Sequence, residues 1–331
     1  MYSCRIYLFT YKRNELLPRA VQSLLNQTFT DWICEVHNDD PADDFPAQYI
    51  CNLNDPRFAL KNHSQNLGAV RSFNLAFAGC DEQFASMLED DNWWEPEFLN
   101  TAISFLNHNP EVNMVWSNMR LWQEYPGNNW SDTGKTTWSY GQDQLFNWWQ
   151  QRQIIGHMHS NGAMVYRPAE LAGSLIPDNT LFNAIEAIRE RSFKHPIALL
   201  ASPLANFAIT LSTNRSASAT EWIATQVMLL ASFVNTAPDK KQAFAATLAH
   251  HRKLTPSPIA NFYLANKWVI KDYSLNQLFT VKDRLFLMKW IIKNSFIISK
   301  IKRYIDDHQA VYQYLIEHTK NRFTETTNHK Y

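Results

Sequence analysis

The chain has 331 residues, enough to bury a full core as one large domain or as two ordinary ones. Its 31 basic and 31 acidic residues balance, which argues against nucleic acid as the main partner, because nucleic-acid-binding proteins usually carry a basic excess. Neither a G-x-G-x-x-G motif nor a P-loop occurs among its eight glycines, so an ordinary dinucleotide-binding fold and a P-loop kinase are disfavoured.

The N-terminal sequence does not resemble a secretory signal peptide, because its first apolar run, at residues 6–10, is short and two basic residues follow it. No window reaches the roughly 18 uncharged apolar residues of a membrane span. The four cysteines include no C-x-x-C pair and are expected to be free thiols in a reducing compartment. We therefore expect a cytoplasmic protein, with a peripheral place at the inner face of the membrane left open.

The first 120 residues alternate between strand and helix patterns. Short apolar runs of the kind that form buried strands occur at residues 6–10, 32–37, 84–88 and 114–116. Helical spacing occurs from Asn14, the expected N-cap, to Leu25, and at residues 68–78 and 96–106. This alternation predicts an α/β fold with a mostly parallel sheet flanked by helices on both faces. Thr10, Asp39 and Asp91 would then lie at carboxyl ends of strands, where such sheets bind ligands.

The pattern changes after the predicted sheet strands. Residues 123–143 are polar and turn-rich and are expected to form a loop, whereas residues 159–166 predict a further strand. Helical spacing dominates the last third of the chain. We expect one α/β domain over residues 1–215 and a helical extension over residues 216–331.

Three adjacent acids, Glu89, Asp90 and Asp91, follow the apolar run at residues 84–88. Like charges this close repel one another, which costs stability unless a cation joins them. Mg²⁺ and Mn²⁺ prefer carboxylate oxygens together with the phosphates of a substrate. The block therefore predicts a site for a divalent cation, Mg²⁺ or Mn²⁺, and a solvated acidic turn is the alternative that these residues alone leave open.

Five short motifs occur in order along the first 100 residues: F-T-Y-K-R at 9–13, S-L-L-N-Q-T-F at 23–29, V-H-N-D-D at 36–40, N-L-G-A-V-R at 66–71 and E-D-D-N at 89–92. Their order and spacing resemble those of the inverting glycosyltransferases of the GT-A fold, the large family 2 type. The resemblance implies a Rossmann-like GT-A domain. Asn38 and the Asp40-Pro41 pair depart from the family's V-D-D-G-S, so the turn after this strand is expected to differ.

The resemblance also implies which residues bind the sugar donor. Thr10 and Tyr11 would line the base and ribose, and Asp39 would accept a hydrogen bond from the base, as family members do with uracil. Arg71 would face the diphosphate or shape the base pocket. The alternatives left open are a turn-forming role for Asp39 and a helix-surface charge for Arg71. The implied donor-binding residues are Thr10, Tyr11, Arg13, Asp39, Asn66, Arg71 and Asp90.

In the same resemblance Asp91 binds the metal, and Glu89 replaces the first acid of the family's D-x-D block as a second ligand. An inverting transfer also needs a carboxylate that takes the proton of the acceptor hydroxyl. The family places this base in a Glu-Asp pair about eight residues after an Asp, and Asp178 and Glu186 are eight residues apart. Glu186 is therefore the candidate base and Asp178 the reserve, with a surface glutamate paired to an arginine as the alternative.

Three aromatic residues are candidates for binding the acceptor. Trp93 and Trp94 follow the acidic block, and indole faces stack on sugars, although core packing is the commoner use of tryptophan. His159 lies two residues after His157 in the strand pattern, so both rings would share one face, where they could bind a ligand or a metal. A half-buried polar edge is the alternative for this pair.

Residues 282–303 carry seven basic side chains against Asp283 alone, interleaved with apolar residues. The pattern predicts a basic amphipathic helix. Such a helix could lie on an anionic membrane, or it could pack on the catalytic domain with its lysines in water.

Together these features predict a metal-dependent inverting glycosyltransferase. It would move a sugar from a nucleotide-diphosphate sugar, with a UDP-sugar favoured, to a saccharide or lipid-linked acceptor in bacterial-type cell-surface polysaccharide synthesis. The alternative is a catalytically inactive module that binds a nucleotide sugar or a glycan, because the Glu-Asp pair has been reduced to one acid. A sugar-phosphate nucleotidyltransferase is disfavoured, since its glycine-rich phosphate loop is absent.

Overall fold

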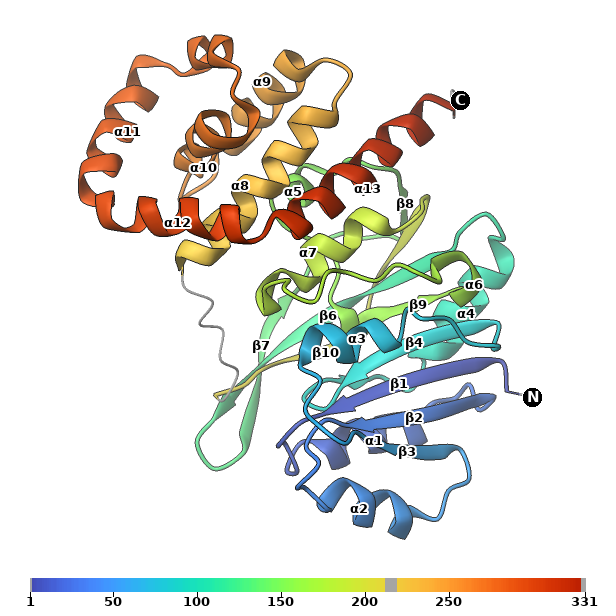
Figure 1. The fold of residues 1–331 in the computed structure, drawn as a ribbon. Helices are drawn as coiled ribbons and strands as arrows, with labels where there is room; N and C mark the ends of the chain where they lie inside the picture. Colours follow the sequence, from blue (N-terminus) through green and yellow to red (C-terminus); the bar gives the residue numbers. More distant parts are fainter. Residues whose placement is uncertain (1, 212–218, 329–331) are drawn as a thin grey trace. The chain divides into compact units, whose positions relative to one another are not determined.

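The structure, a computed structural model, describes residues 2–211 and 219–328 (Figure 1). The chain divides into two compact units. The first comprises Met1–Asn147, His159–Leu175 and Phe193–Thr213, and the second comprises Trp148–Met158, Ile176–Ser192 and Asn214–Tyr331. The expected boundary after residue 215 lies outside the described residues, and the second unit also takes in two earlier segments, residues 148–158 and 176–192.

Four parallel strands form one side of the central sheet of the first unit. They are paired in the order β3 (Phe58–Asn62), β2 (Trp32–Asn38), β1 (Cys4–Thr10) and β4 (Phe84–Glu89). The strands expected at residues 6–10, 32–37 and 84–88 are thereby confirmed, each one to two residues longer than predicted. The mostly parallel α/β architecture is confirmed as well, because strand and helix alternate along this part of the chain.

The other side of the sheet is mixed. β6 (Met114–Tyr125) runs parallel to β10 (Ile197–Ile209), and β9 (Met164–Tyr166) is inserted antiparallel between β4 and β6. Short antiparallel strands complete the sheet of the described residues: β5 (Trp93–Trp94), β7 (Asn129–Thr136) and β8 (Gln144–Phe146).

Helices of the first unit pack on both faces of the sheet. They are α1 (Leu17–Leu25), α2 (Phe45–Leu53), α3 (Ala69–Leu75), α4 (Phe98–His108), the 3-10 helix η1 (Asn161–Ala163) and α6 (Pro168–Leu171). Ile6 and Leu8 of β1 are buried in one core with residues of α1 and α4. Phe9 points to the other face, because side chains alternate along a strand, and its ring meets Phe73 of α3 at 5.3 Å.

The expected N-cap of the first helix is wrong. α1 begins at Leu17, with Leu16 at the N-cap position and Pro18 in the first turn. The side chain of Asn14 instead donates to Asp43 Oδ1 at 3.2 Å, so it ties together the two loops that follow β1 and β2. The apolar residues that give this segment its helical spacing are nevertheless buried, among them Leu17, Ala20, Val21 and Leu24.

Residues 123–143, expected to form a loop, contain the end of β6 and the whole of β7, which pair as an antiparallel hairpin. Gly127 and Asn128 at its tip have φ values of 81° and 56°, a left-handed geometry that glycine and asparagine tolerate best. The expected strand at residues 159–166 is also partly wrong, since η1 precedes a short β9.

The strand β10 was not predicted. Pro203 lies in its middle, and proline is normally excluded from central strands because it lacks an N–H donor. The structure accommodates it with two shifts of register against β6, between Leu200 and Ala205, so the ladder is interrupted where the proline occurs.

The described part of the second unit is helical. Its elements are α5 (Gln151–Ile154), η2 (Phe182–Ala184), α7 (Ile185–Arg189), η3 (Glu190–Ser192), α8 (Ala219–Thr236), α9 (Lys240–His251), α10 (Ile259–Ala265), the π-helical turn η4 (Asn266–Ile270), η5 (Tyr273–Leu278), α11 (Val281–Lys293), α12 (Ser295–Asp307) and α13 (Gln309–Asn328). α8 is the central helix, with a buried face that includes Val227, Leu230 and Val234. Among the residues described, none of the helices combines the length and apolarity that crossing a bilayer requires.

Residues 282–303 do not form the single helix that was expected. α11 ends at Lys293 and α12 begins at Ser295. Asn294 separates them, with φ −113° and ψ 18°, and its side chain donates to Trp290 O at 2.8 Å. An asparagine side chain that bonds its own preceding turn favours a helix end.

Candidate active site

The carboxyl ends of β1, β2 and β4 meet at one edge of the sheet. Thr10 pairs with Asn38, and Phe9 pairs with Glu89, so Asp39 and Asp90 follow directly at neighbouring positions. The backbone N–H of Asp39 donates to Thr10 O at 3.0 Å, and that of Asp90 donates to Phe9 O at 3.0 Å. The sequence prediction that polar residues after three strands share one rim is confirmed.

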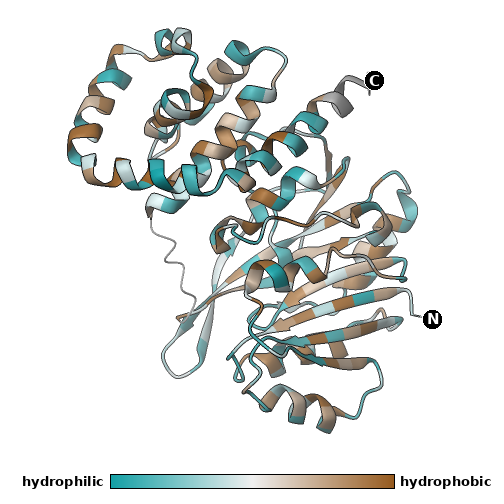
Figure 2. Cartoon of the chain, in the orientation of Figure 1, coloured by the Kyte–Doolittle hydropathy of each residue, from teal (hydrophilic) through white to brown (hydrophobic). Residues whose placement is uncertain are grey.

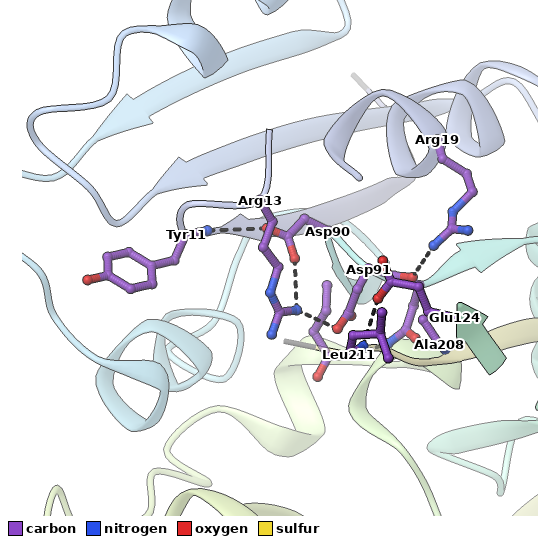
Figure 3. A network of polar contacts seen from close by, with 10 residues as sticks. Tyr11, Arg13, Arg19, Asp90, Asp91, Glu124, Ala208 and Leu211 are labelled. Atoms are coloured by element: carbon purple, nitrogen blue, oxygen red, sulfur yellow. Dashed lines mark hydrogen bonds and ion pairs between the residues drawn. The ribbon is translucent and has the colours of Figure 1, made fainter. Parts of the chain in front are cut away.

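Asp90 and Asp91 form a buried acidic pair at this rim (Figure 3). Asp90 accepts from the backbone N–H of Tyr11 at 3.2 Å and from Arg13 Nη1 at 3.3 Å. The same Arg13 nitrogen forms an ion pair with Asp91. Burial, followed by the charge of Asp91, raises the pKa of Asp90 to about 7. Burial likewise raises the pKa of Asp91, so the pair favours any further positive charge that approaches it.

Arg19 supports the pair from α1, a role that the sequence analysis missed. Its Nη2 donates to the backbone carbonyl of Asp91 at 2.8 Å. Its guanidinium lies between two indoles, 3.8 Å from the Trp93 ring centroid and 4.1 Å from that of Trp130. Burial lowers the pKa of Arg19 to about 10. The sequence carried no signal for this stack, because Trp130 belongs to the hairpin that was expected to be a loop.

Glu89, the expected second metal ligand, is oriented differently from its two neighbours. Its Oε2 accepts from Asn92 Nδ2 at 2.7 Å. A Cβ atom added at Gly162 would lie 3.0 Å from the same oxygen, so Glu89 packs closely against η1. Two carboxylates of the acidic block, those of Asp90 and Asp91, therefore share the counter-ion Arg13.

Two of the three expected acceptor residues are in the core. Trp94 is 2% exposed, and its Nε1 donates to Gly162 O at 2.7 Å. His159 is 2% exposed and stacks on Trp116 with ring centroids 4.8 Å apart. Trp93 is half-buried, and Arg19 covers one of its faces. Of these three side chains, Trp93 is the one with exposed surface that a ligand could contact.

Asp39 holds the start of α3. Its carboxylate accepts from the backbone N–H groups of Leu67 at 2.7 Å and Gly68 at 3.0 Å, and from Ser72 Oγ at 3.2 Å. Asn66 Oδ1 accepts a further bond of 2.7 Å from the N–H of Gly68, whose φ of 76° suits glycine. The predicted residues Asp39 and Asn66 are thus brought together, with their oxygens directed at the backbone around Gly68.

The remaining donor candidates differ in exposure. Thr10 is buried at the end of β1, whereas Tyr11 is 44% exposed at the start of the following loop. Arg71 is exposed on α3. The rim therefore has a buried hydroxyl group at Thr10 and, next to it, the exposed ring of Tyr11, on which a ligand ring could stack.

A cavity of about 480 Å³ lies beside Arg13, the counter-ion of the acidic pair. Arg13 lines it together with Lys12 and Asp40, which form an ion pair at 3.7 Å. Glu124 and Leu211 close another part of the wall, and Glu124 Oε2 accepts from the N–H of Leu211 at 2.7 Å. The lining is mostly polar and carries both signs of charge.

Glu186 and Asp178, the predicted base and its reserve, belong to the second unit. Glu186 lies in the first turn of α7 and is half-buried. Asp178 is exposed in the turn that precedes η2. The assignment of either as a base stays a prediction.

The residues at the rim suit a divalent cation that also binds a substrate. In the part of the chain that the structure describes, no group of three or more His, Cys, Asp or Glu side chains could hold a metal ion alone. Mg²⁺, however, is usually held by one or two carboxylates together with substrate phosphates rather than by an all-protein cage. Asp90 and Asp91 supply two buried carboxyl groups, and Arg13 pairs with both of them.

The first part of the chain is similar in sequence to known glycosyltransferases. The sequence profile of glycosyl transferase family 2 matches residues 6–168. WcaA of Escherichia coli, named as a colanic acid biosynthesis glycosyl transferase, is 30% identical over 108 residues, which are 32% of this chain and 38% of WcaA. WfgD of Escherichia coli, a UDP-Glc:alpha-D-GlcNAc-diphosphoundecaprenol beta-1,3-glucosyltransferase, is 25% identical over 120 residues, 36% of this chain and 47% of WfgD. The chain thus spans less than half the length of either relative.

The fold has counterparts among solved structures. The crystal structure of S. aureus TarS 1–349 in complex with UDP matches with a TM-score of 0.62 and 15% identity, covering 93% of this chain and 91% of that chain. The match therefore extends past the profile match and includes the helical C-terminal region. The expected fold, a GT-A-type α/β domain with a helical extension, is confirmed.

Proposed function

We propose that this chain, whose residues 6–168 match the profile of glycosyl transferase family 2, transfers a sugar from a UDP-sugar to a saccharide or lipid-linked acceptor with inversion. The observation that carries the proposal is the buried Asp90–Asp91 pair at the carboxyl ends of parallel strands, beside a polar cavity. Ligands of open α/β sheets bind at this edge.

The donor and the acceptor class are proposed from the curated relatives. WfgD is named for UDP-Glc as donor and for a diphosphoundecaprenol-linked acceptor, and WcaA is named for colanic acid biosynthesis. These names support a UDP-sugar donor, a polyprenol-linked or saccharide acceptor, and a role in bacterial polysaccharide synthesis.

Asp91 and Asp90 are the residues that would hold a divalent cation, Mg²⁺ or Mn²⁺. Such an ion would neutralise the diphosphate leaving group. The chain's own groups prepare this site: the Tyr11 N–H orients Asp90, and Arg19 fixes the carbonyl of Asp91. Arg13, which pairs with both acids, would turn its guanidinium toward the donor phosphates when a cation takes its place.

Three further roles complete the proposal. Asp39 fixes the loop around Gly68 and would present its remaining acceptor capacity to the uracil ring. Glu186 would take the proton of the acceptor hydroxyl, the step that an inverting transfer requires. Trp93 would border the acceptor with the part of its indole that Arg19 leaves uncovered.

Ligand-induced stabilisation tests the proposal directly. We expect UDP and UDP-sugars to raise the unfolding temperature more than GDP or CDP in the presence of Mn²⁺, because a ligand of the native state stabilises it by RT ln(1 + [L]/Kd). Release of UDP from a UDP-sugar in the presence of the protein would then separate an enzyme from the alternative, a module that binds without turnover. Equal response to all nucleotides, or to none, would contradict the assignment.

A further inference from the structure

Helix α11 of the second unit exposes an apolar stripe. Of its thirteen residues, Asp283 and Leu287 are the buried ones. Val281, Leu285, Met288 and Ile292 recur at intervals of three or four and are 74%, 52%, 55% and 73% exposed. Residues at this spacing share one face of a helix. Figure 2 shows apolar and polar residues alternating around this helix.

A row of lysines borders the stripe. Lys282, Lys289 and Lys293 each come one position after a residue of the stripe. One position is a rotation of roughly 100° around the helix, and all three lysines are exposed. Asp283, the acid of this helix, is buried and forms an ion pair of 2.7 Å with Arg252. The exposed surface of α11 therefore has two adjacent strips, the apolar stripe and a positively charged row of lysines.

The stripe continues into a hollow of about 420 Å³. Met288 and Ile292 belong to both, and Phe279, Leu287 and Ile291 add apolar walls. Arg284, on the side of the stripe opposite the lysines, also lines the hollow, and its Nη2 donates to Asn276 O at 3.0 Å. Phe296, in the first turn of α12 after the break at Asn294, is a further exposed apolar side chain, 72% exposed.

We propose that α11 is a membrane-binding helix that lies in the interface of an anionic phospholipid bilayer. Its apolar stripe would enter the boundary of the acyl chains, with the hollow beside it open to hydrocarbon, and its lysines would contact lipid phosphates. An interfacial helix has this division into an apolar and a lysine-rich face. A second copy of the chain is the less suitable occupant, because it would bring two lysine rows toward each other, whereas an anionic surface neutralises them.

Vesicle binding by the whole protein tests the proposal without donor or acceptor, so its outcome is independent of the proposed enzymatic function. Sedimentation would be measured with vesicles of phosphatidylcholine alone and of phosphatidylcholine mixed with phosphatidylglycerol. We expect binding to the mixed vesicles and its release by salt, which screens charges. Substituting Lys282, Lys289 and Lys293 by Gln should weaken binding about a hundredfold, since each lysine near an anionic surface contributes roughly a fivefold factor.

The paired variant Leu285→Gln with Ile292→Gln removes apolar area and should abolish binding while the lysines remain. The matched controls are Lys253→Gln and Leu254→Gln, exposed residues of the same unit outside α11, which should bind as the parent does. All variants alter exposed side chains, and unchanged circular dichroism confirms their folding. The proposal is overturned if the parent does not bind mixed vesicles at low salt, if the α11 variants bind as tightly as the parent, or if the parent is a dimer that the α11 variants dissociate.

Discussion

Arg13 forms an ion pair with Asp91, and the same guanidinium lies 3.3 Å from Asp90. The chain therefore supplies a counter-ion for its own acidic pair. From the sequence, the three adjacent acids required a cation from outside. In the structure the three acids have partners within the chain. Glu89 accepts a hydrogen bond from Asn92, and Arg13 partly neutralises Asp90 and Asp91.

Removing this counter-ion should destabilise the protein and create a response to metal alone. We expect Arg13→Ala to lower the free energy of unfolding by roughly 1–3 kcal/mol, because two buried carboxylates lose a charged hydrogen-bond donor. Mn²⁺ without nucleotide should raise the unfolding temperature of the variant more than that of the parent. Denaturant titrations and thermal scans with and without Mn²⁺ measure both effects. Lys12→Ala, a change at an exposed neighbour, is the control. Equal stability of the parent, Arg13→Ala and Lys12→Ala would show that Arg13 does not stabilise the acidic pair.

Asp39 can be tested for its two roles separately. Asp39→Asn should cost roughly 1–3 kcal/mol of stability, since its amide nitrogen replaces one of the two oxygens and cannot accept from the N–H of Leu67 or Gly68 that this oxygen served. Ser72→Ala removes the third of its donors and leaves the carboxylate in place. We expect UDP affinity to fall about tenfold or more in Asp39→Asn, a loss of about 1.4 kcal/mol, and to change little in Ser72→Ala. If calorimetry gives the same UDP affinity for Asp39→Asn and Ser72→Ala, Asp39 is structural alone.

The proposed base predicts a loss of turnover without a loss of binding. Glu186→Gln should cut turnover by roughly 10²–10⁴, the usual range for a missing general base, and leave donor affinity nearly unchanged. Asp178→Asn is the comparison, because Asp178 is the reserve candidate. Transfer at the parent rate by Glu186→Gln would exclude Glu186, and a loss confined to Asp178→Asn would transfer the role to that residue.

His37 predicts a loss of stability in mild acid. It is buried beside Phe9, with His63 Nε2 3.0 Å from its Nδ1 and Glu35 Oε1 3.1 Å from its Nε2. Burial lowers its pKa from 6.5 to about 4, against the opposing effect of Glu35. Between these two values the unfolded chain binds a proton that the native state does not, so stability falls as pH falls.

At pH 5 this single group should cost roughly 2 kcal/mol relative to neutral pH. Urea unfolding at pH 7 and pH 5 measures the loss, and His37→Gln should show a smaller one, because other buried histidines keep their own contributions. An identical pH dependence in the parent and His37→Gln would show that His37 is not the group responsible.

The sequence predicted the rim of the sheet because its strands obey simple rules. Residues 6–10, 32–37 and 84–88 are short apolar runs, each followed by polar residues, and parallel pairing brings their ends together. The sequence alone therefore predicts that Asp39, Asp90 and Asp91 lie at one edge of the sheet.

The contacts that cross between distant segments could not be predicted in this way. Trp130 reaches Arg19 because residues 123–143 form a hairpin, and their polar, turn-rich composition concealed the strand pairing. β10 was missed because Pro203 is unusual within a strand, and its bulge depends on pairing with β6. His159 shows the same limit: its spacing from His157 predicts a ring on a ligand-binding face or at a half-buried edge, but the ring is buried against Trp116.

The central claim is that Asp91 and a divalent cation together bind the diphosphate of the donor. Titration calorimetry of UDP against the parent and Asp91→Ala, each with Mn²⁺ and with chelator, tests it most directly. The account predicts that Mn²⁺ tightens UDP binding to the parent by at least about tenfold, since the ion joins the phosphates to a buried carboxylate. Asp91→Ala should bind UDP weakly and without regard to metal, yet remain folded, because Arg13 keeps its contact with Asp90. Equal, metal-independent UDP affinity in both proteins would contradict the claim.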